Sequence, residues 1–346
     1  EGVFKRLLHG CTGTLIIIEH NLLFLHDLCE RAVVLADGRV HHDCAFNDLL
    51  SNPQALREHG LDFTFRFVDR DRHYNGAGHH RHYLPTHDHG PEGDHLTPKD
   101  SGVPLIELQH YSFCYSDGTP AINDINLGLF AGETIALVGE NGAGKSTLAH
   151  CLLGLHRGKG TFLVDGRPLV KGDWPRLWRR VGIVFQYSAD QLFCPSCWEE
   201  VAFGPQQLGL SPGEVERRVQ KALAVVQLQG FEKRVPLHMS GGERKRLAIA
   251  ATLSLQPEIL ILDEPTASLD PKSEEQLLAV LEALPMAMLL ITHDLFFIRR
   301  LCSRTVVLRQ GRIIRDYKTG AFLADNQLRT INGLDNINKS NWLAEI

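Results

Sequence analysis

A glycine-rich segment with one lysine and one serine carries the clearest chemistry in this chain. It reads Gly-Glu-Asn-Gly-Ala-Gly-Lys-Ser-Thr and directly follows the apolar run 134–138. Glycines let backbone N–H groups converge on phosphate oxygens, and a helix that begins there adds favourable partial charge. We therefore expect Lys145 to reach the β- and γ-phosphates of a nucleotide and the Ser146 hydroxyl to bind Mg²⁺. The expected phosphate-binding residues are Gly139, Glu140, Asn141, Gly142, Ala143, Gly144, Lys145, Ser146 and Thr147.

Two adjacent acidic residues follow a second apolar run. Residues 259–262 read Ile-Leu-Ile-Leu, and Asp263 and Glu264 come directly after them. A carboxylate at the end of a strand beside a phosphate-binding loop can hold Mg²⁺, and this role is expected of Asp263. Glu264 can polarise an attacking water. An acidic pair alone is a weak signal, but its position downstream of Lys145 makes it a strong one.

A serine and two glycines open a third motif, Met-Ser-Gly-Gly-Glu-Arg-Lys-Arg at 239–246. Ser240 and Glu243 have the spacing of a capping box, which indicates a helix start. This motif resembles the signature of the ATP-binding-cassette (ABC) family, which is typically Leu-Ser-Gly-Gly-Gln. The resemblance implies that Ser240, Gly241 and Gly242 bind the γ-phosphate of ATP held by an opposing domain. Glu243 departs from the family glutamine and places an acid near the nucleotide.

The resemblance extends over 104–335 and implies further site residues. Tyr115 matches the aromatic residue that stacks on adenine, although a core aromatic is the alternative. Gln186 matches the Q-loop glutamine that senses Mg²⁺ and the attacking water. His293 matches the switch histidine that contacts the γ-phosphate. The implied fold is α/β: a P-loop NTPase with a RecA-like core, an antiparallel β subdomain and a helical signature subdomain.

The chain also repeats itself with a constant offset of 273 residues, so that 18–22 aligns with 291–295 and 33–35 with 306–308. The repeat predicts a strand, a turn with His20 or His293, a helix and a second strand. We expect residues 1–62 to be the truncated C-terminal part of a first cassette, marginally ordered or packed on a partner. Residues 104–335 would form a complete cassette, followed by a tail, 336–346. A dedicated small N-terminal domain is the alternative.

Residues 63–103 differ in composition from both copies and are expected to form a disordered linker. Seven of the eighteen histidines lie there: His73, His79, His80, His82, His87, His89 and His95. Imidazoles this dense can bind Ni²⁺, Co²⁺, Zn²⁺ or Cu²⁺. Incidental metal affinity and metal buffering are both open.

Composition narrows the class of partner. A net charge of −5 argues against a nucleic-acid partner held by bulk charge. No apolar run approaches the roughly 20 residues that span a bilayer, so a membrane role would be peripheral. The eight cysteines are scattered, as is typical of reduced thiols in a cytosolic protein. Cys194 and Cys197 form a single Cys-x2-Cys pair, which indicates either incidental thiols or a metal or redox sensor.

Two short segments after Gln186 indicate the kind of ABC protein. They read Asp-Gln-Leu-Phe at 190–193 and Val-Ala-Phe-Gly-Pro at 201–205. Both resemble the energy-coupling-factor importers of vitamins, cobalt or nickel. The resemblance implies ATP and Mg²⁺ as cofactors, and as partners a second cassette, a transmembrane coupling subunit and a substrate-capture subunit at the cytoplasmic face of the membrane. A soluble tandem ABC ATPase acting on ribosomes or DNA and a metal-buffering protein are the alternatives.

Overall fold

The structure, a computed structural model, describes residues 14–19, 22–25, 28–36, 38–62, 66, 102–170 and 172–325. Nearly all of the expected linker 63–103, the tail 336–346 and His20 lie outside the described residues. These described parts divide into two compact units. The smaller unit takes its described residues from 14–66 and from Ser268–Leu278, and the larger unit takes the rest.

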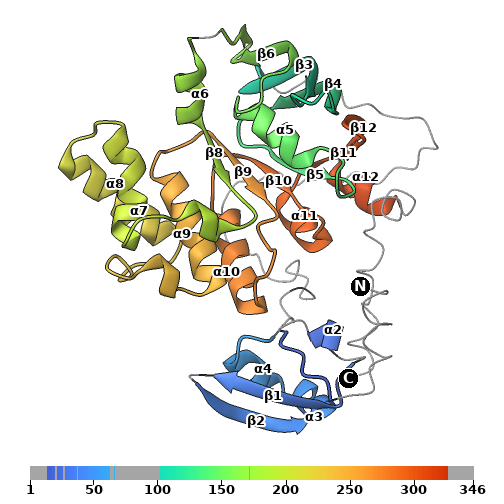
Figure 1. The fold of residues 1–346 in the computed structure, drawn as a ribbon, viewed down its shortest axis with the longest axis vertical. Coiled ribbons are helices and arrows are strands. Elements are labelled where there is room, and N and C mark those ends of the chain that lie inside the picture. Colours follow the sequence, from blue (N-terminus) through green and yellow to red (C-terminus); the bar gives the residue numbers. More distant parts are fainter. Residues whose placement is uncertain are drawn as a thin grey trace, which may run out of the picture. The chain divides into compact units, whose positions relative to one another are not determined.

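A six-stranded sheet forms the centre of the larger unit (Figure 1). Five of its strands are parallel, and only the edge strand β12 runs antiparallel, to its neighbour β11. Both faces of the inner strands are buried, which explains why their sequences are almost continuously apolar. In sheet order the strands are β12 (Arg312–Lys318), β11 (Arg304–Arg309), β5 (Thr134–Val138), β10 (Ala287–Ile291), β9 (Ile259–Asp263) and β8 (Val181–Val184).

An antiparallel four-stranded sheet accompanies the first sheet, in the order β4 (Pro120–Leu129), β3 (Ile106–Cys114), β6 (Lys159–Val164) and β7 (Arg167–Pro168). Helix α5 (Lys145–Leu152) contributes Leu148 and Leu152 to one apolar core shared with residues of both sheets. Helix α6 (Trp174–Arg180) adds Trp174 and Leu177 to this core. The phosphate-binding loop before α5 is thus anchored on a rigid base.

Helices α7 (Cys197–Gln207), α8 (Pro212–Val225) and α9 (Gly241–Leu253) group together beside β8 in Figure 1. Helix α8 begins as its sequence predicts, because Ser211 accepts a hydrogen bond from the Glu214 backbone and Pro212 takes the first helical position. Its apolar stripe is buried: Val215, Val219, Ala222, Leu223 and Val226. Two short 3₁₀ turns, η3 (Ser188–Gln191) and η4 (Pro236–His238), lead into α7 and α9.

Three further helices are α10 (Pro271–Glu282), whose residues up to Leu278 are assigned to the smaller unit, α11 (Leu295–Leu301) and α12 (Thr319–Ala324). Helix α11 begins because the Asp294 side chain accepts hydrogen bonds from the Phe296 and Phe297 backbones. None of the helices in the described part of the chain is long and apolar enough to cross a bilayer.

The smaller unit has a core of its own. Besides the first part of α10, its elements are α2 (Leu22–Leu25), β1 (Arg31–Ala36), β2 (Arg39–Ala45), α3 (Phe46–Leu50) and α4 (Pro53–Glu58). Buried residues of these elements, including Val34, Phe46, Leu49 and Ala55, form one apolar cluster. However, Val33 and Leu35 on the other face of β1 are 50% and 70% exposed.

The hairpin β1–β2 has the same hydrogen-bond register as the hairpin β11–β12, displaced by 273 residues at every pair. Arg31 opposes Ala45 as Arg304 opposes Lys318, and the one irregularity follows Val34 in the first copy and Val307 in the second. Gly38 and Gly311 close the two turns with φ angles of 72° and 74°. The repeat found in the sequence is therefore also a structural repeat.

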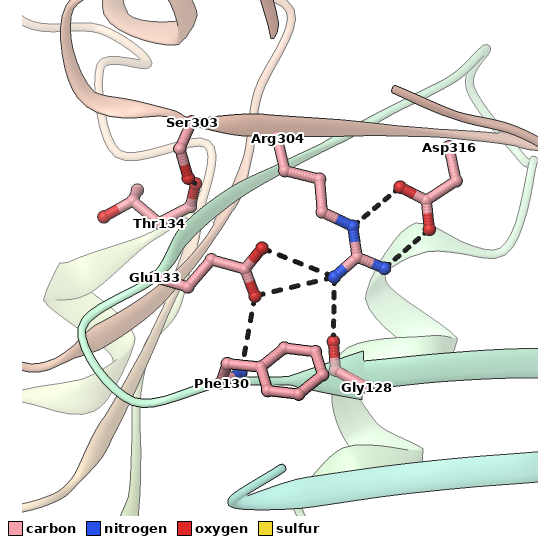
Figure 2. Close-up of polar contacts among 7 residues, drawn as sticks. All are labelled: Gly128, Phe130, Glu133, Thr134, Ser303, Arg304 and Asp316. Atoms are coloured by element: carbon pink, nitrogen blue, oxygen red, sulfur yellow. Dashed lines mark hydrogen bonds and ion pairs between the residues drawn. The ribbon is translucent and has the colours of Figure 1, made fainter. Parts of the chain in front are cut away.

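One ion pair recurs in both copies but in different surroundings. Arg31 donates to both carboxylate oxygens of Asp43 at 2.6 Å, and its side chain is 72% exposed. Arg304 pairs in the same way with Asp316, but its side chain is only 11% exposed. Figure 2 shows that Arg304 also contacts the Glu133 carboxylate and donates to the Gly128 carbonyl, at 3.1 Å. The same side chain is thus a surface group in one copy and a buried connector in the other.

The first strand that the repeat predicts, before the turn with His20, is not formed: residues 14–19 have no regular structure. Their counterpart in the larger unit, β10, lies between β5 and β9 and bonds to both. The sheet of the smaller unit contains only β1 and β2 among the described residues, so the apolar run 14–18 has no third strand to pair with. Ile16 and Ile18 are accordingly 84% and 96% exposed.

Candidate nucleotide-binding and catalytic site

The phosphate-binding loop lies between β5 and α5, as the sequence predicts. Gly139 and Gly144 are required by space as well as by backbone angle. A Cβ at Gly139 would lie 2.2 Å from the Leu308 carbonyl oxygen, and one at Gly144 would lie 2.8 Å from that of Ala121. Gly144 also caps α5 with a φ of 102°. The loop therefore lies directly against its neighbours while Asn141 and Gly142 remain exposed.

Lys145 folds back over this loop. Its ammonium donates to the Gly139 carbonyl at 2.7 Å and to the Glu140 carbonyl at 3.0 Å. Burial lowers the pKa of Lys145, and the nearby Glu264 and Asp263 carboxylates oppose that shift. A positive charge at the mouth of a glycine-rich loop suits a polyphosphate.

Oxygen ligands for a divalent cation meet beside the loop. The Ser146 hydroxyl donates to Asp263 Oδ2 at 2.8 Å, which brings the start of α5 to the end of β9. Burial raises the pKa of Asp263, while the Ser146 hydrogen bond opposes the shift. One hydroxyl and one carboxylate fit Mg²⁺, which takes few protein oxygens and keeps water in its remaining positions. The described residues contain no cluster of three or more His, Cys, Asp or Glu side chains that would suggest another metal.

Glu264 and His293 face each other across the ends of β9 and β10. The parallel register pairs Asp263 with Ile291, and the Glu264 backbone N–H donates to the Ile291 carbonyl at 2.8 Å. His293 Nδ1 lies 3.1 Å from Glu264 Oε1 and 3.0 Å from Oε2, with hydrogen-bond geometry at Oε1 alone. That bond raises the pKa of His293. Glu264 also has a φ of 42°, a backbone strain often found at functional sites.

Tyr115 lies beside the loop and remains 40% exposed. Its hydroxyl is 2.8 Å from Thr147 Oγ1, and its ring contacts Phe113 and His156 edge to face. The rings of Phe113 and His156 stack with an interplanar angle of 11°. An aromatic side chain tied to the loop and still exposed can receive a nucleobase. The core alternative for Tyr115 is thereby disfavoured.

Gln186 follows β8, whose Val184 pairs with Leu262 of β9, so Gln186 lies at the same sheet edge as the acidic pair. Gln186 is exposed, and its backbone carbonyl accepts a hydrogen bond from the Lys245 ammonium at 2.7 Å. Sequence patterns did not single out Lys245, because a lysine on a helix normally faces solvent. Here it is 2% exposed, and burial lowers its pKa to about 8.

The helix-start motif forms as expected. Ser240 Oγ accepts from the Glu243 backbone at 3.2 Å, and the Glu243 carboxylate accepts from the Ser240 backbone at 2.8 Å. This complete capping box gives a physical reason for the acid at position 243. Ser240 and Gly241 are exposed at the beginning of α9, where N–H groups are available to an anion.

The two cysteines of the Cys-x2-Cys pair have different environments, since Cys194 is only partly buried. Cys197 is fully buried, and its Sγ lies 3.3 Å from the sulfur of Met239, the residue that replaces the family leucine. Burial raises the pKa of both Cys194 and Cys197 to about 11, so neither is a thiolate near neutral pH. These observations favour structural thiols over a metal or redox sensor.

Comparison with known proteins assigns the site to a family. The family model for ABC transporters matches residues 122–267. A Streptomyces avermitilis protein with the provisional name ABC transporter ATP-binding protein is 42% identical over 240 residues, which cover 69% of this chain and 92% of the relative. The energy-coupling factor transporter ATP-binding protein EcfA of Methanothermobacter thermautotrophicus is 43% identical, over 61% of this chain and 70% of that protein.

Solved structures agree with this assignment. CbiO1 of Clostridium perfringens, described as part of the ABC transporter complex cbiONQ, aligns with a TM-score of 0.61 at 31% identity and covers 70% of this chain and 99% of that one. A dimeric cassette in a post-hydrolysis state, bound to ADP and Pi, aligns with a TM-score of 0.55 at 26% identity and covers 62% of this chain and 99% of its own. The class is therefore a P-loop ATPase with the cassette fold. This chain belongs to the ABC transporter family of ATP-binding cassettes, which hydrolyse ATP.

Proposed function

We propose that this chain powers an importer of the energy-coupling-factor type, and that Glu264 activates the water that cleaves ATP. The single observation that carries the catalytic part is the meeting of Glu264 and His293 at the end of β9, next to Lys145 and Ser146. His293 holds the Glu264 carboxylate by a hydrogen bond, and Glu264 can then accept a proton from water.

Other residues of the site hold the nucleotide in this proposal. Lys145 and the loop amides bind the β- and γ-phosphates, and Tyr115 stacks on the base. Ser146, Asp263 and Gln186 hold Mg²⁺, which neutralises charge that develops on the phosphates. Ser240, Gly241 and Gly242 serve the nucleotide of a second cassette, so hydrolysis needs two cassettes. Opening after hydrolysis would move a transmembrane partner as a rigid body.

A patch of exposed aromatics supports a membrane-embedded partner. Phe193 and Phe203, which are 67% and 41% exposed, form this patch, since their ring centroids lie 5.0 Å apart. Tyr187, closer to β8 in the same segment, is also 67% exposed. We infer that this patch, on the segment after β8 and on α7, receives an amphipathic helix of a transmembrane coupling subunit. The chain would then be a peripheral protein at the cytoplasmic face of the membrane.

The importer type rests on the segments around this patch and on the named relatives. Gln191 of the Asp-Gln-Leu-Phe run holds the end of β8, donating to the Ile183 carbonyl and accepting from the Phe185 backbone. The EcfA relative and CbiO1 favour the same class. Cobalt, nickel or a vitamin would be selected by a substrate-capture subunit. Copurification of a membrane complex with the full chain would support this type, whereas recovery with ribosomes would contradict it.

The matching hairpins support a tandem origin. We propose that 14–62 correspond to the C-terminal part of a first cassette, with Val33 and Leu35 at positions where Val306 and Leu308 are fully buried. The complete cassette would occupy 104–335.

Replacing Glu264 with Gln tests the catalytic role. The variant should bind ATP with unchanged affinity and lose turnover by about 10²- to 10⁴-fold, as expected for removal of a general base. Glu258→Gln is the matched control, because Glu258 precedes the other end of β9 and pairs with Arg180 at the surface. Equilibrium ATP binding and steady-state phosphate release measure the two effects. Parental turnover in Glu264→Gln would refute the assignment.

A further inference from the structure

Lys245 has an unusual position for a lysine on a helix. It lies in the second turn of α9, five residues after Ser240, and only 2% of it is exposed. Its ammonium donates to the Gln186 carbonyl at 2.7 Å and to the Phe185 carbonyl at 3.2 Å. Lysine is almost never fully buried without a partner, and here the partners are two successive backbone carbonyls.

The charge of Lys245 is held in place without a direct ion pair. No carboxylate lies within ion-pair distance of it in the described part of the chain, although Asp263 and Glu264 act on it from further away. The position of the ammonium is therefore fixed by its hydrogen bonds to the Phe185 and Gln186 carbonyls, which lie in the segment directly after β8. Because that segment includes Gln186, Lys245 connects the signature helix directly to the Q-loop main chain.

A second side chain, that of Gln191, also holds this segment. Gln191 accepts from the Phe185 backbone N–H at 3.2 Å and donates to the Ile183 carbonyl at 3.0 Å. The backbone from 183 to 186 thus has contacts with η3 and with α9, whose Thr252 hydroxyl also donates to the Ile183 carbonyl at 3.4 Å. The contacts of Lys245 come from the second turn of α9, close to Ser240 and Gly241 at the start of that helix.

We propose that Lys245 is a positioning residue that makes the signature helix and the Q-loop move as one body during the ATPase cycle. The proposal rests on the roles proposed above for Gln186 and Ser240. Gln186 serves the nucleotide of its own cassette and Ser240 that of the opposing one, so Lys245 links the two nucleotides of a pair. Lys245 itself touches neither nucleotide.

Three substitutions separate this role from simple packing. Lys245→Met keeps the length of the side chain and removes the charge and the donors, while Lys245→Arg keeps both. Ser254→Ala is the control: Ser254 is a buried polar residue at the end of the same helix, and its hydroxyl donates to the Ala251 carbonyl rather than to the Q-loop. Lys245→Gln, which retains a donor, replaces the Met variant if the latter fails to fold.

We expect Lys245→Met to bind ATP with an affinity within about twofold of the parent and to lose about tenfold in kcat. Lys245→Arg should recover most of the loss, and Ser254→Ala should keep the parental kcat. Hydrogen exchange should become faster at the amides of 185–187 in the Met variant and remain unchanged in α8. The assays use the full chain at a concentration at which the parent hydrolyses ATP.

Two results would overturn the proposal: a parental kcat in Lys245→Met, or equal losses in Lys245→Met and Ser254→Ala. A loss of ATP affinity that matches the loss of kcat would count equally against it. Failure of the proposed function gives a different pattern, because the parent would then not hydrolyse ATP, or Glu264→Gln would retain full turnover.

Discussion

At the scale of single residues, the hydrogen bond between His293 and Glu264 is the contact on which the chemistry depends. The His293 side chain is 71% exposed, so its charge is screened by solvent and contributes little to the stability of the fold. Its effect is on the protonation of the site instead. Because the Glu264 bond raises the pKa of His293, the imidazolium form persists to higher pH than in a free histidine.

We expect Glu264→Gln to lower the pKa of His293, since a neutral amide does not stabilise the imidazolium as a carboxylate does. The charged Glu264 carboxylate raises the pKa of His293, so the pKa should fall when a neutral side chain replaces it. Titration of the His293 ring signals by NMR in the parent and in the variant measures the shift.

Much of the site could be predicted from sequence because each motif residue has a local reason for its place. Lys145, Asp263, Glu264 and His293 all follow or end apolar strands, and parallel strands bring their carboxyl ends to one edge. Lys245 could not be predicted. Its burial depends on how α9 packs against the segment after β8, a long-range contact with no local pattern in the sequence.

At the scale of elements, the start of α9 has competing demands. Glu243 stabilises the helix through its bond to the Ser240 backbone, and its carboxylate lies 3.8 Å from Arg234. The same negative charge lies at the helix end that is proposed to meet a γ-phosphate. The start of α9 is thus well capped, but its negative charge makes it less suited to bind an anion than a signature helix with glutamine at this position.

Glu243→Gln should increase turnover by a few fold, because glutamine can still accept the Ser240 hydrogen bond while removing the repulsion of phosphate. The stability of the chain should change by less than about 1 kcal/mol, since one side of the capping box remains unaltered. Steady-state ATPase and urea denaturation check the two expectations. Glu243→Ala, which removes the acceptor as well, should be less stable than Glu243→Gln. A fall in turnover in Glu243→Gln would contradict the repulsion argument.

Elements were easier to predict where their partners are in the same unit. The strands at 134–138, 259–262 and 288–291 formed as the sequence indicates, because each has hydrogen-bonded neighbours. The run 14–18 has the same apolar character and remained irregular. Apolar composition indicates a strand, but pairing decides whether one forms.

At the scale of the whole molecule, the two matching hairpins provide an internal comparison of one ion pair in two environments. Arg304 joins β11, β12 and the turn before β5, as Figure 2 shows. Burial raises the pKa of Glu133, and the Arg304 charge opposes that shift. The charged form of the Glu133 carboxylate therefore depends on Arg304. Arg31 has the same bond to Asp43 at the surface.

Arg304→Met should destabilise the chain by about 3 kcal/mol, because it leaves the Asp316 and Glu133 carboxylates mostly buried without their cation. Arg31→Met is the matched control and should leave the unfolding midpoint unchanged, since exposed ion pairs contribute little. Thermal and urea unfolding of both variants measure the difference. Equal effects of the two substitutions would show that burial is not what distinguishes the two pairs.

The contact between Cys197 and Met239 has a practical consequence. The Cys197 thiol is completely shielded at the beginning of α7, beneath the residue that precedes Ser240. A thiol-specific reagent can therefore reach it only when α7 separates from the start of α9. Mass spectrometry that follows labelling of Cys197 would measure how fast α7 separates from α9. The measurement uses the unmodified sequence and needs no added fluorophore.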